Sequence, residues 1–269
     1  MTTTSIDADC SHADKSVRVI RVEADYLQLS AILLIIAATV TAVSAAGVSL
    51  DLAFSAVFFD AARQFSGARD HYVAALRDHG FISLAVCIAC VGLGVAKLLP
   101  WKTPFAIQPR ISAFLVTAYV LGPGILTNAI LKQHWGRPRP GAVLEFGGAL
   151  PYVDWWDTAG SCLRNCSFTS GEAAAAAWLL GPAMFVPPPW RALAIGAAAA
   201  FFVFTSMLRV AMGAHFLADV VIGGLGSLLL LLALRPIFFP HRRWSLAIAW
   251  ANVREKLVSL LRLRQPAMP

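Results

Sequence analysis

Two long apolar runs of this chain meet at the stretch Arg209-Val210-Ala211-Met212-Gly213-Ala214-His215-Phe216-Leu217-Ala218-Asp219. The stretch supplies a cation, an imidazole and a carboxylate. Residues four positions apart lie on one face of a helix, so we expect Asp219 to hold an imidazole N–H of His215 and to support positive charge on the ring. This arrangement suits a histidine nucleophile, with Arg209 placed to bind phosphate oxygens. The alternative is a histidine that only satisfies a helix end beside a membrane.

The composition of the chain indicates an integral membrane protein. Its 269 residues are 58% hydrophobic and 14% charged, whereas soluble domains have roughly 25% charged residues. A helix that crosses a bilayer needs about 20 mostly apolar residues, and six segments meet that condition. We therefore predict an all-α, polytopic bundle of six transmembrane helices. The predicted spans are Tyr26–Gly47, Phe81–Leu99, Ile111–Leu131, Ala173–Val186, Ala192–Leu208 and Leu217–Leu234.

The first of these spans could instead be a signal peptide cleaved near Ala45-Ala46. It follows a mixed-charge segment of about 25 residues and is longer than a signal core of roughly 7–15 residues. A retained span is therefore favoured. The chain then divides into a cytoplasmic N-terminal segment, 1–25, a membrane domain, 26–235, and a basic amphipathic tail, 236–269, on the anionic inner leaflet.

The charge distribution predicts the topology. The net charge is +7, which taken alone would suggest a nucleic-acid partner. With both termini inside, however, 14 of the 22 Lys and Arg residues lie in inner segments and eight in outer ones, as the positive-inside rule requires. We therefore expect no nucleic-acid partner. The loops 48–80 and 132–171 and the link 209–216 are predicted to face outward, and Leu52–Ala75 is predicted to be an amphipathic helix on the outer interface.

Two of the cysteines fall in the long outward loop. If this face is the bacterial periplasm, its oxidising environment would allow a disulfide between Cys162 and Cys166, and the sequence does not decide whether they are bridged. Zinc is disfavoured because the local sequence lacks a second ligand pair. Cys87 and Cys90, in the second predicted span, are expected to be small packing residues.

Two further polar sets stand at the outer ends of spans. Lys132 and the run Arg137-Pro138-Arg139-Pro140 gather cations on the outward side, against the trend of the topology, and an anion would explain them. Ser170-Gly171 precedes an alanine-rich helix, where a hydroxyl and free backbone N–H groups can bind phosphate. The alternatives are a lysine that extends to the interface and a helix N-cap followed by the acidic residue Glu172.

Taken in order, Lys-x6-Arg-Pro, Ser-Gly and Arg-x5-His-x3-Asp resemble the type 2 phosphatidic acid phosphatase (PAP2) family over residues 111–235, the catalytic half. The resemblance implies that His215 attacks phosphorus and forms a phosphohistidine, that Asp219 orients His215, and that water hydrolyses the intermediate. No metal or other cofactor is expected. The residues implied to bind the phosphate are Lys132, Arg139, Ser170, Gly171 and Arg209.

The chain departs from this family at Glu172, where the family has a histidine that acts as general acid. Glu172 can take that role only if it is protonated, and the surrounding cations oppose protonation. There are two alternatives: His134 assists in protonating the leaving oxygen, or the substrate has a leaving group that needs little protonation. Arg137 and Arg164 would suit a multiply charged glycolipid; the alternative is that they only hold the loop.

The resemblance extends to bacterial lipid A phosphatases. The predicted function is removal of the 1- or 4′-phosphate of lipid A at the periplasmic face of the bacterial inner membrane, with the bilayer and a lipid phosphate as partners. Rival predictions within the class are an undecaprenyl diphosphate or phosphatidylglycerol phosphate phosphatase and a lipid phosphotransferase. From other classes, an inactive lipid-phosphate-binding protein and a transporter remain. The transporter is disfavoured because no predicted span has a charge near its middle.

Overall fold

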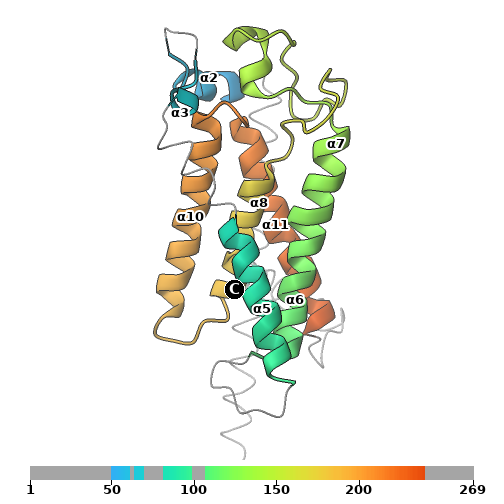
Figure 1. The fold of residues 1–269 in the computed structure, drawn as a ribbon, viewed down its shortest axis with the longest axis vertical. Coiled ribbons are helices and arrows are strands. Elements are labelled where there is room, and N and C mark those ends of the chain that lie inside the picture. Colours follow the sequence, from blue (N-terminus) through green and yellow to red (C-terminus); the bar gives the residue numbers. More distant parts are fainter. Residues whose placement is uncertain (1–49, 61–63, 70–80, 99–106, 240–269) are drawn as a thin grey trace, which may run out of the picture.

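The computed structural model describes residues 50–60, 64–69, 81–98 and 107–239, and their ordered elements are helices (Figure 1). Only two isolated β-bridges occur among these residues, Phe59 with Phe65 and Val143 with Leu150. The all-helical fold class is therefore confirmed for this part of the chain. The predictions for the N-terminal segment, for the first span and for residues 240–269 of the tail lie outside the described residues.

Three helical segments are long and apolar enough to cross a membrane. The first, Pro109–His134, joins α6 (Pro109–Tyr119), η2 (Val120–Leu131) and α7 (Lys132–His134), and the other two are α10 (Arg191–Ala211) and α11 (Leu217–Phe238). They contain 26, 21 and 22 residues, which satisfies the length of about 20 residues that a span needs. They correspond to the third, fifth and sixth predicted spans. The second predicted span contains α5 (Phe81–Ala96), an apolar helix of 16 residues.

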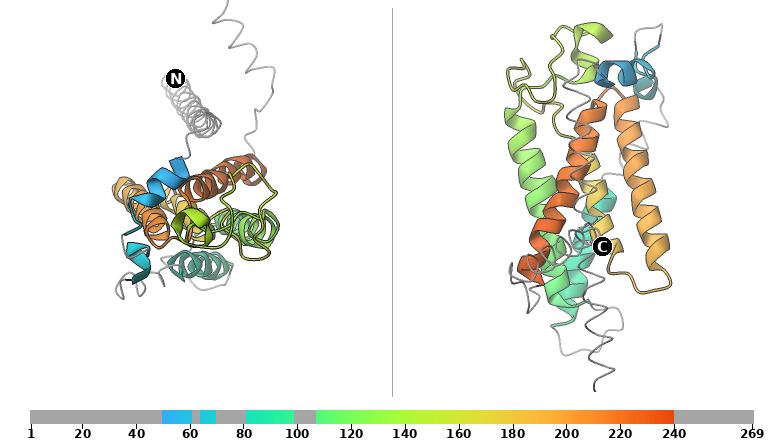
Figure 2. Two further views of the ribbon diagram at one scale, coloured as in Figure 1. Left: turned by 90° about the horizontal axis from the view of Figure 1, so that it is seen from above. Right: turned by 180° about the vertical axis from the view of Figure 1, so that it is seen from behind.

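The fourth predicted span differs from the expectation. In place of one long helix, the structure has α8 (Gly171–Trp178) and α9 (Leu180–Ala183). All residues of α8 except Glu172 are buried, and α8 packs against α10, α11 and η2. Seen from above, α5, α6, α10 and α11 surround it (Figure 2). Hydropathy cannot distinguish a helix buried by protein from one buried by lipid, because both are apolar on every side.

The segment η2 is a π-helix that contains Pro123. Proline has no N–H to donate, and its ring collides with the carbonyl one turn earlier, so an α-helical register cannot continue unchanged through it. The wider π register accommodates the residue. The Asn128 side chain donates a hydrogen bond of 2.7 Å from Nδ2 to the Pro123 carbonyl. Lys132 therefore directly follows a π-helical segment, in which the hydrogen bonds span one residue more than in an α-helix.

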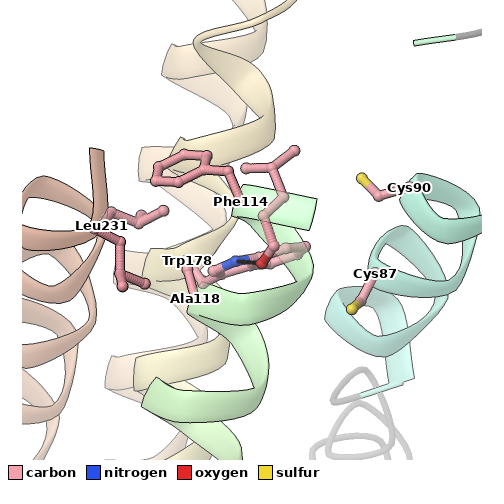
Figure 3. Close-up of a cluster of buried hydrophobic side chains, with 8 residues drawn as sticks. Cys87, Cys90, Phe114, Ala118, Trp178 and Leu231 are labelled. Carbon is pink, nitrogen blue, oxygen red and sulfur yellow. Dashed lines mark hydrogen bonds between the residues drawn. The ribbon is translucent and has the colours of Figure 1, made fainter. Parts of the chain in front are cut away.

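A buried cluster around Trp178 joins the helices at the level of α5 (Figure 3). The indole Nε1 of Trp178 donates to the Leu115 carbonyl at 3.0 Å, and the ring lies edge-on to Tyr119 at a centroid distance of 4.9 Å. Cys87 and Cys90 are buried, free thiols of this cluster, which confirms that they are packing residues. The buried members are Cys87, Cys90, Phe114, Leu115, Ala118, Trp178, Leu231 and Leu234.

Short elements cover the end of the bundle where α10 ends and α11 begins (Figure 1). They are α2 (Leu50–Ala56), α3 (Ser66–Arg69), η3 (Pro140–Ala142) and η4 (Leu144–Phe146). The prediction of one amphipathic helix over Leu52–Ala75 is wrong in its described part, because α2 and α3 are separate helices. The chain turns between them so that Phe59 and Phe65 stack edge-on at 5.3 Å.

The turn between α10 and α11 depends on a glycine. Gly213 has φ +64°, and a Cβ there would lie 2.4 Å from the Phe65 ring. Both the left-handed backbone and the contact with Phe65 therefore exclude a side chain. This turn sets the direction in which α11 leaves, and it places His215 immediately before that helix.

Candidate active site

The polar residues singled out from the sequence lie at the ends of α7, α8, α10 and α11, and their side chains form ion pairs or act on one another through their charges. Lys132 is the first residue of α7, and Glu172 lies in the first turn of α8. Arg209 lies in the last turn of α10, and Asp219 in the first turn of α11. His215 lies between these last two helices. Three separate stretches of the sequence thus contribute to one site.

His215 is buried and held by one nitrogen. Its Nδ1 lies 2.7 Å from the backbone carbonyl oxygen of Ser167. A carbonyl can only accept, so Nδ1 carries the hydrogen and Nε2 keeps its lone pair. Among the described residues Nε2 has no hydrogen-bond partner, and it faces Glu172 Oε2 at 3.7 Å. The free nitrogen is therefore the one that is placed to attack a substrate.

The charges around His215 act in opposite directions. Burial lowers the pKa of His215, and Arg209 lowers it further, while Glu172 and Asp219 raise it. The net direction is downward from the ordinary value of about 6.5. The imidazole is therefore neutral near pH 7, which is the state that a nucleophile requires.

Asp219 does not contact the imidazole directly. Its Oδ2 lies 3.9 Å from Nδ1 of His215, which is too long for a hydrogen bond. Instead it accepts hydrogen bonds from the Ser167 hydroxyl, from the Phe216 N–H at 2.9 Å and from Arg137 Nη1 at 2.5 Å. Ser167 thus connects the two residues, since its carbonyl accepts from His215 and its hydroxyl donates to Asp219. The expectation that Asp219 holds an imidazole N–H from the same helix face is therefore wrong: His215 precedes α11, and the Ser167 carbonyl accepts that N–H instead. The spacing predicted only that the two residues lie close together.

Glu172 faces both the histidine and a cation. Its Oε1 lies 3.4 Å from Arg209 Nη2, and its side chain is 31% exposed. Burial raises the pKa of Glu172, but His215, Arg209 and Lys132 outweigh burial and hold it well below its ordinary value. At 3.7 Å the contact with His215 is too long for a hydrogen bond, and the ring is neutral near pH 7, so the cations Arg209 and Lys132 are the main cause of the lowered pKa of Glu172. Without a bound anion, Glu172 is ionised.

The start of α8 has both an N-cap serine and a glycine beside the free backbone N–H groups of the helix N-terminus. Ser170 is the N-cap, and its hydroxyl accepts from the Ala173 N–H at 3.3 Å. The residue is fully buried. A Cβ on Gly171 would lie 2.4 Å from Asn128 Oδ1, so a larger residue would displace that amide. The helix N-terminus therefore opens beside Lys132 and Glu172 with nothing larger than a hydrogen atom on Gly171.

The predicted phosphate-binding cations are not equivalent. Lys132 and Arg209 are both buried, and their charges act on Glu172. Arg139 instead donates to Asn165, from Nε to its carbonyl at 3.2 Å and from Nη2 to Oδ1 at 3.0 Å. Asn165 lies in the loop closed by a disulfide between Cys162 and Cys166, so the structure decides the bridge that the sequence left open.

A cleft of about 240 Å³ opens beside this group. Its polar part is Lys132, Glu172 and Asn128, and it extends along η2 and α8. The residues that line it are Tyr119, Asn128, Lys132, Gly171, Glu172 and Ala175. A bound molecule in this cleft would therefore lie against the carboxylate that faces His215.

Arg137 is not available to a substrate. Its side chain is fully buried and forms ion pairs with Asp219 and Asp51. The interpretation of Arg137 as an extra cation for a multiply charged glycolipid is therefore wrong, and the alternative, that it holds the loop, is correct. Asp51 was missed because a single acidic residue at the start of an amphipathic segment carries no signal of a distant partner.

Comparisons with known proteins match the chain to one family. A family model described as the PAP2 superfamily matches residues 112–243. A lipid A 4′-phosphatase of Rhizobium etli is 48% identical over 117 residues, which cover 44% of this chain and 46% of the relative. The lipid A 4′-phosphatase of Rhizobium leguminosarum is 47% identical over 115 residues, which cover 43% of this chain and 49% of the relative. The chain thus spans about half the length of these two curated relatives.

A third relative is matched over more of its length. The lipid A 4′-phosphatase of Francisella tularensis subsp. novicida is 30% identical over 189 residues, which cover 66% of this chain and 81% of the relative. No solved structure gives a significant match.

Proposed function

The chain belongs to the PAP2 superfamily, and on this premise we propose that it is a membrane phosphatase that removes the 4′-phosphate of lipid A through a phosphohistidine on His215. The observation that carries the proposal is the buried, neutral imidazole of His215. Its Nδ1 is fixed by the Ser167 carbonyl, and its Nε2 faces Glu172 at 3.7 Å. The choice of lipid A and of the 4′ position follows the names of the three relatives.

In the first step, Nε2 of His215 forms a bond to phosphorus while the bond from phosphorus to the sugar oxygen breaks. The phosphate oxygens lie against Lys132 and Arg209, with the Gly171 N–H and the Ser170 hydroxyl beside them. Such fixed positive groups stabilise phosphoryl transfer because charge spreads over the equatorial oxygens. Arg139 completes the set if its guanidinium turns from Asn165 to the substrate.

Glu172 is the proposed acid. The leaving sugar oxygen takes the proton of its carboxyl group, and in the second step Glu172 removes a proton from the water that attacks phosphorus. The bond between phosphorus and Nε2 then breaks, inorganic phosphate leaves and His215 is again neutral. Glu172 is ionised in the empty site, so its protonation depends on the bound phosphate, whose negative charge offsets the cations and raises the carboxyl pKa.

The cleft beside Glu172 is the proposed place for the sugar of the substrate. An acid must lie within hydrogen-bond reach of the oxygen to which it gives its proton, and Glu172 lines the cleft together with Asn128 and Tyr119. The chain is a membrane protein with three apolar helices among its described residues. We propose that the site faces the periplasm from the inner membrane, because the Lys and Arg residues then follow the positive-inside rule.

The test is phosphate release from lipid A and from short-chain phosphatidic acid by purified protein with EDTA present. The His215→Ala variant is compared with wild type, and Arg191→Ala, at the opposite end of α10, is the control. We expect release from lipid A in the wild type and the control, and none in His215→Ala. Labelled phosphate should be trapped on the wild-type protein in an acid-labile form. An active His215→Ala would exclude this nucleophile.

The same assay separates the rival substrates. Faster release from undecaprenyl diphosphate or phosphatidylglycerol phosphate than from lipid A would overturn the choice of lipid. Transfer of label to a second lipid would identify a phosphotransferase. A folded wild type that releases phosphate from none of these lipids would leave the inactive lipid-phosphate-binding protein as the function.

A further inference from the structure

An acidic residue far from the family motifs is joined to the candidate active site through a buried cation. Arg137 donates from Nη1 to Asp219 at 2.5 Å and from Nη2 to Asp51 at 2.6 Å. Its side chain has no exposed surface, and its guanidinium lies over the Phe216 ring at 4.5 Å. Arg137 also donates from Nε to the Val153 carbonyl at 2.9 Å. The guanidinium is therefore held on several sides.

Asp51 makes a second contact that bears on the same helix. Its Oδ1 accepts from the backbone N–H of Ala218 at 2.8 Å. Ala218 is the second residue of α11, where the N–H groups have no partner within the helix. One carboxylate from α2 thus caps the helix that carries Asp219 and also binds the cation that pairs with Asp219.

The two carboxylates share one positive charge. If both are ionised, Asp51, Arg137 and Asp219 together carry a net charge of −1. Arg137 neutralises Asp219 less completely than it would in a simple pair, because Asp51 attracts the same guanidinium. Asp219 lies 3.9 Å from Nδ1 of His215, so its remaining charge is close enough to favour positive charge on the ring.

We propose that Asp51 is a positioning residue for the reaction. It acts through Arg137 to fix Asp219 and to preserve the negative charge of Asp219 beside His215. This inference rests on the proposed function. When Nε2 takes up the phosphoryl group, the ring becomes cationic while Nδ1 stays bonded to Ser167. The charge on Asp219 stabilises that state, and Asp51 maintains the charge. Asp51 lies outside the segment 112–243 that matches the family model.

The decisive variant is Asp51→Asn. It keeps the shape of the side chain and an oxygen for the Ala218 N–H, but it removes the charge. We expect kcat to fall about tenfold or more while KM stays within about twofold, because the groups that bind phosphate are untouched. The control is Asp60→Asn, which removes a carboxylate just after α2 whose oxygen accepts from the Gln64 N–H at 3.1 Å. Its kcat should equal that of the wild type.

A second readout needs no substrate. The ¹⁵N shifts of the His215 ring in detergent report its titration directly. Glu172 on α8, Arg209 on α10 and Asp219 on α11 all face this ring and are unchanged in both variants. The ring should lose its proton at a lower pH in Asp51→Asn than in the wild type, and at the wild-type pH in Asp60→Asn.

These readouts separate failure of this inference from failure of the proposed function. A wild type inactive on lipid A refutes the substrate, while the titration still tests Asp51. A folded Asp51→Asn protein with the wild-type titration, or with unchanged kcat and raised KM, would overturn the inference. If thermal unfolding shows that Asp51→Asn is not folded, Asp51→Glu is the test. It retains the charge, so it should titrate like the wild type, and a clear downward shift in it would refute the charge argument.

Discussion

Replacing Glu172 by glutamine should have two opposite effects in one protein. The carboxylate lies 3.4 Å from Arg209 and 3.7 Å from His215. It is therefore next to any phosphate that Nε2 attacks. Glutamine has nearly the same shape but neither the negative charge nor the acidic proton. The variant should bind phosphate more tightly and turn over more slowly.

The size of each effect follows from the geometry. A reacting phosphorus about 3–3.5 Å from Nε2 places phosphate oxygens roughly 5 Å from the carboxylate. If Glu172 stayed ionised, its charge and that of phosphate at roughly 5 Å and an effective dielectric constant near 20 would repel by about 3 kcal/mol. Taking up a proton avoids the repulsion but also costs free energy, because the pKa of Glu172 lies below its ordinary value in the empty site. The side chain is 31% exposed, so solvent screening reduces the repulsion to about 1–2 kcal/mol, which corresponds to inhibition by inorganic phosphate about tenfold stronger. Loss of a general acid lowers kcat by about 10²–10⁴-fold.

The assay measures kcat on lipid A and the inhibition constant of inorganic phosphate for the wild type and Glu172→Gln. Glu145→Gln, which replaces an acidic residue of η4, is the matched control and should resemble the wild type. Glu172→His, which restores the residue that the family usually carries, should regain turnover. Wild-type kcat in Glu172→Gln would refute the role as acid, and unchanged inhibition by phosphate would refute the electrostatic argument.

Two further predictions concern the nucleophile and the phosphate site. Because the pKa of His215 lies below its ordinary value, the ring stays neutral as the pH falls through about 6.5. We therefore expect kcat/KM to remain constant there and to decline only at lower pH. A decline centred at or above about 6.5 would contradict this. Gly171→Ala should lower kcat/KM by about tenfold or more, because its Cβ would lie 2.4 Å from Asn128 Oδ1. That amide is held by its hydrogen bond to the Pro123 carbonyl. The double variant Gly171→Ala/Asn128→Ala should recover part of the lost kcat/KM, and an equal loss in both variants would exclude this steric cause.

The sequence predicted the grouping of the site better than its internal contacts. Lys132, Glu172, Arg209 and His215 were expected together because each stands at the same end of a predicted span, and the structure brings them together. The spacing of His215 and Asp219 likewise predicted that they are neighbours. It could not predict the hydrogen bond of Nδ1, because the Ser167 carbonyl is a backbone group that any residue would supply.

Arg137 and α8 show why other predictions failed. A cation near a phosphate site is expected to bind phosphate, and only the position of Asp51, 86 residues away, shows that Arg137 is buried between carboxylates. The fourth span was predicted from hydropathy, which does not record whether lipid or protein surrounds a helix. The amphipathic segment after residue 50 was predicted as helical, but the turn that separates α2 from α3 depends on ring contacts such as that of Phe59 with Phe65.

The alanine-rich helix at the centre of the bundle limits how this enzyme can evolve. Residues 173–177 are buried in α8, which packs against η2 and against the helices that carry Arg209 and Asp219. Larger side chains there would press on these neighbours. Adaptation to a new lipid would therefore leave α8 unchanged and would involve residues at the edge of the cleft. Asn128, which lines the cleft and is exposed, is the kind of position where substitutions can accumulate without moving the reacting groups.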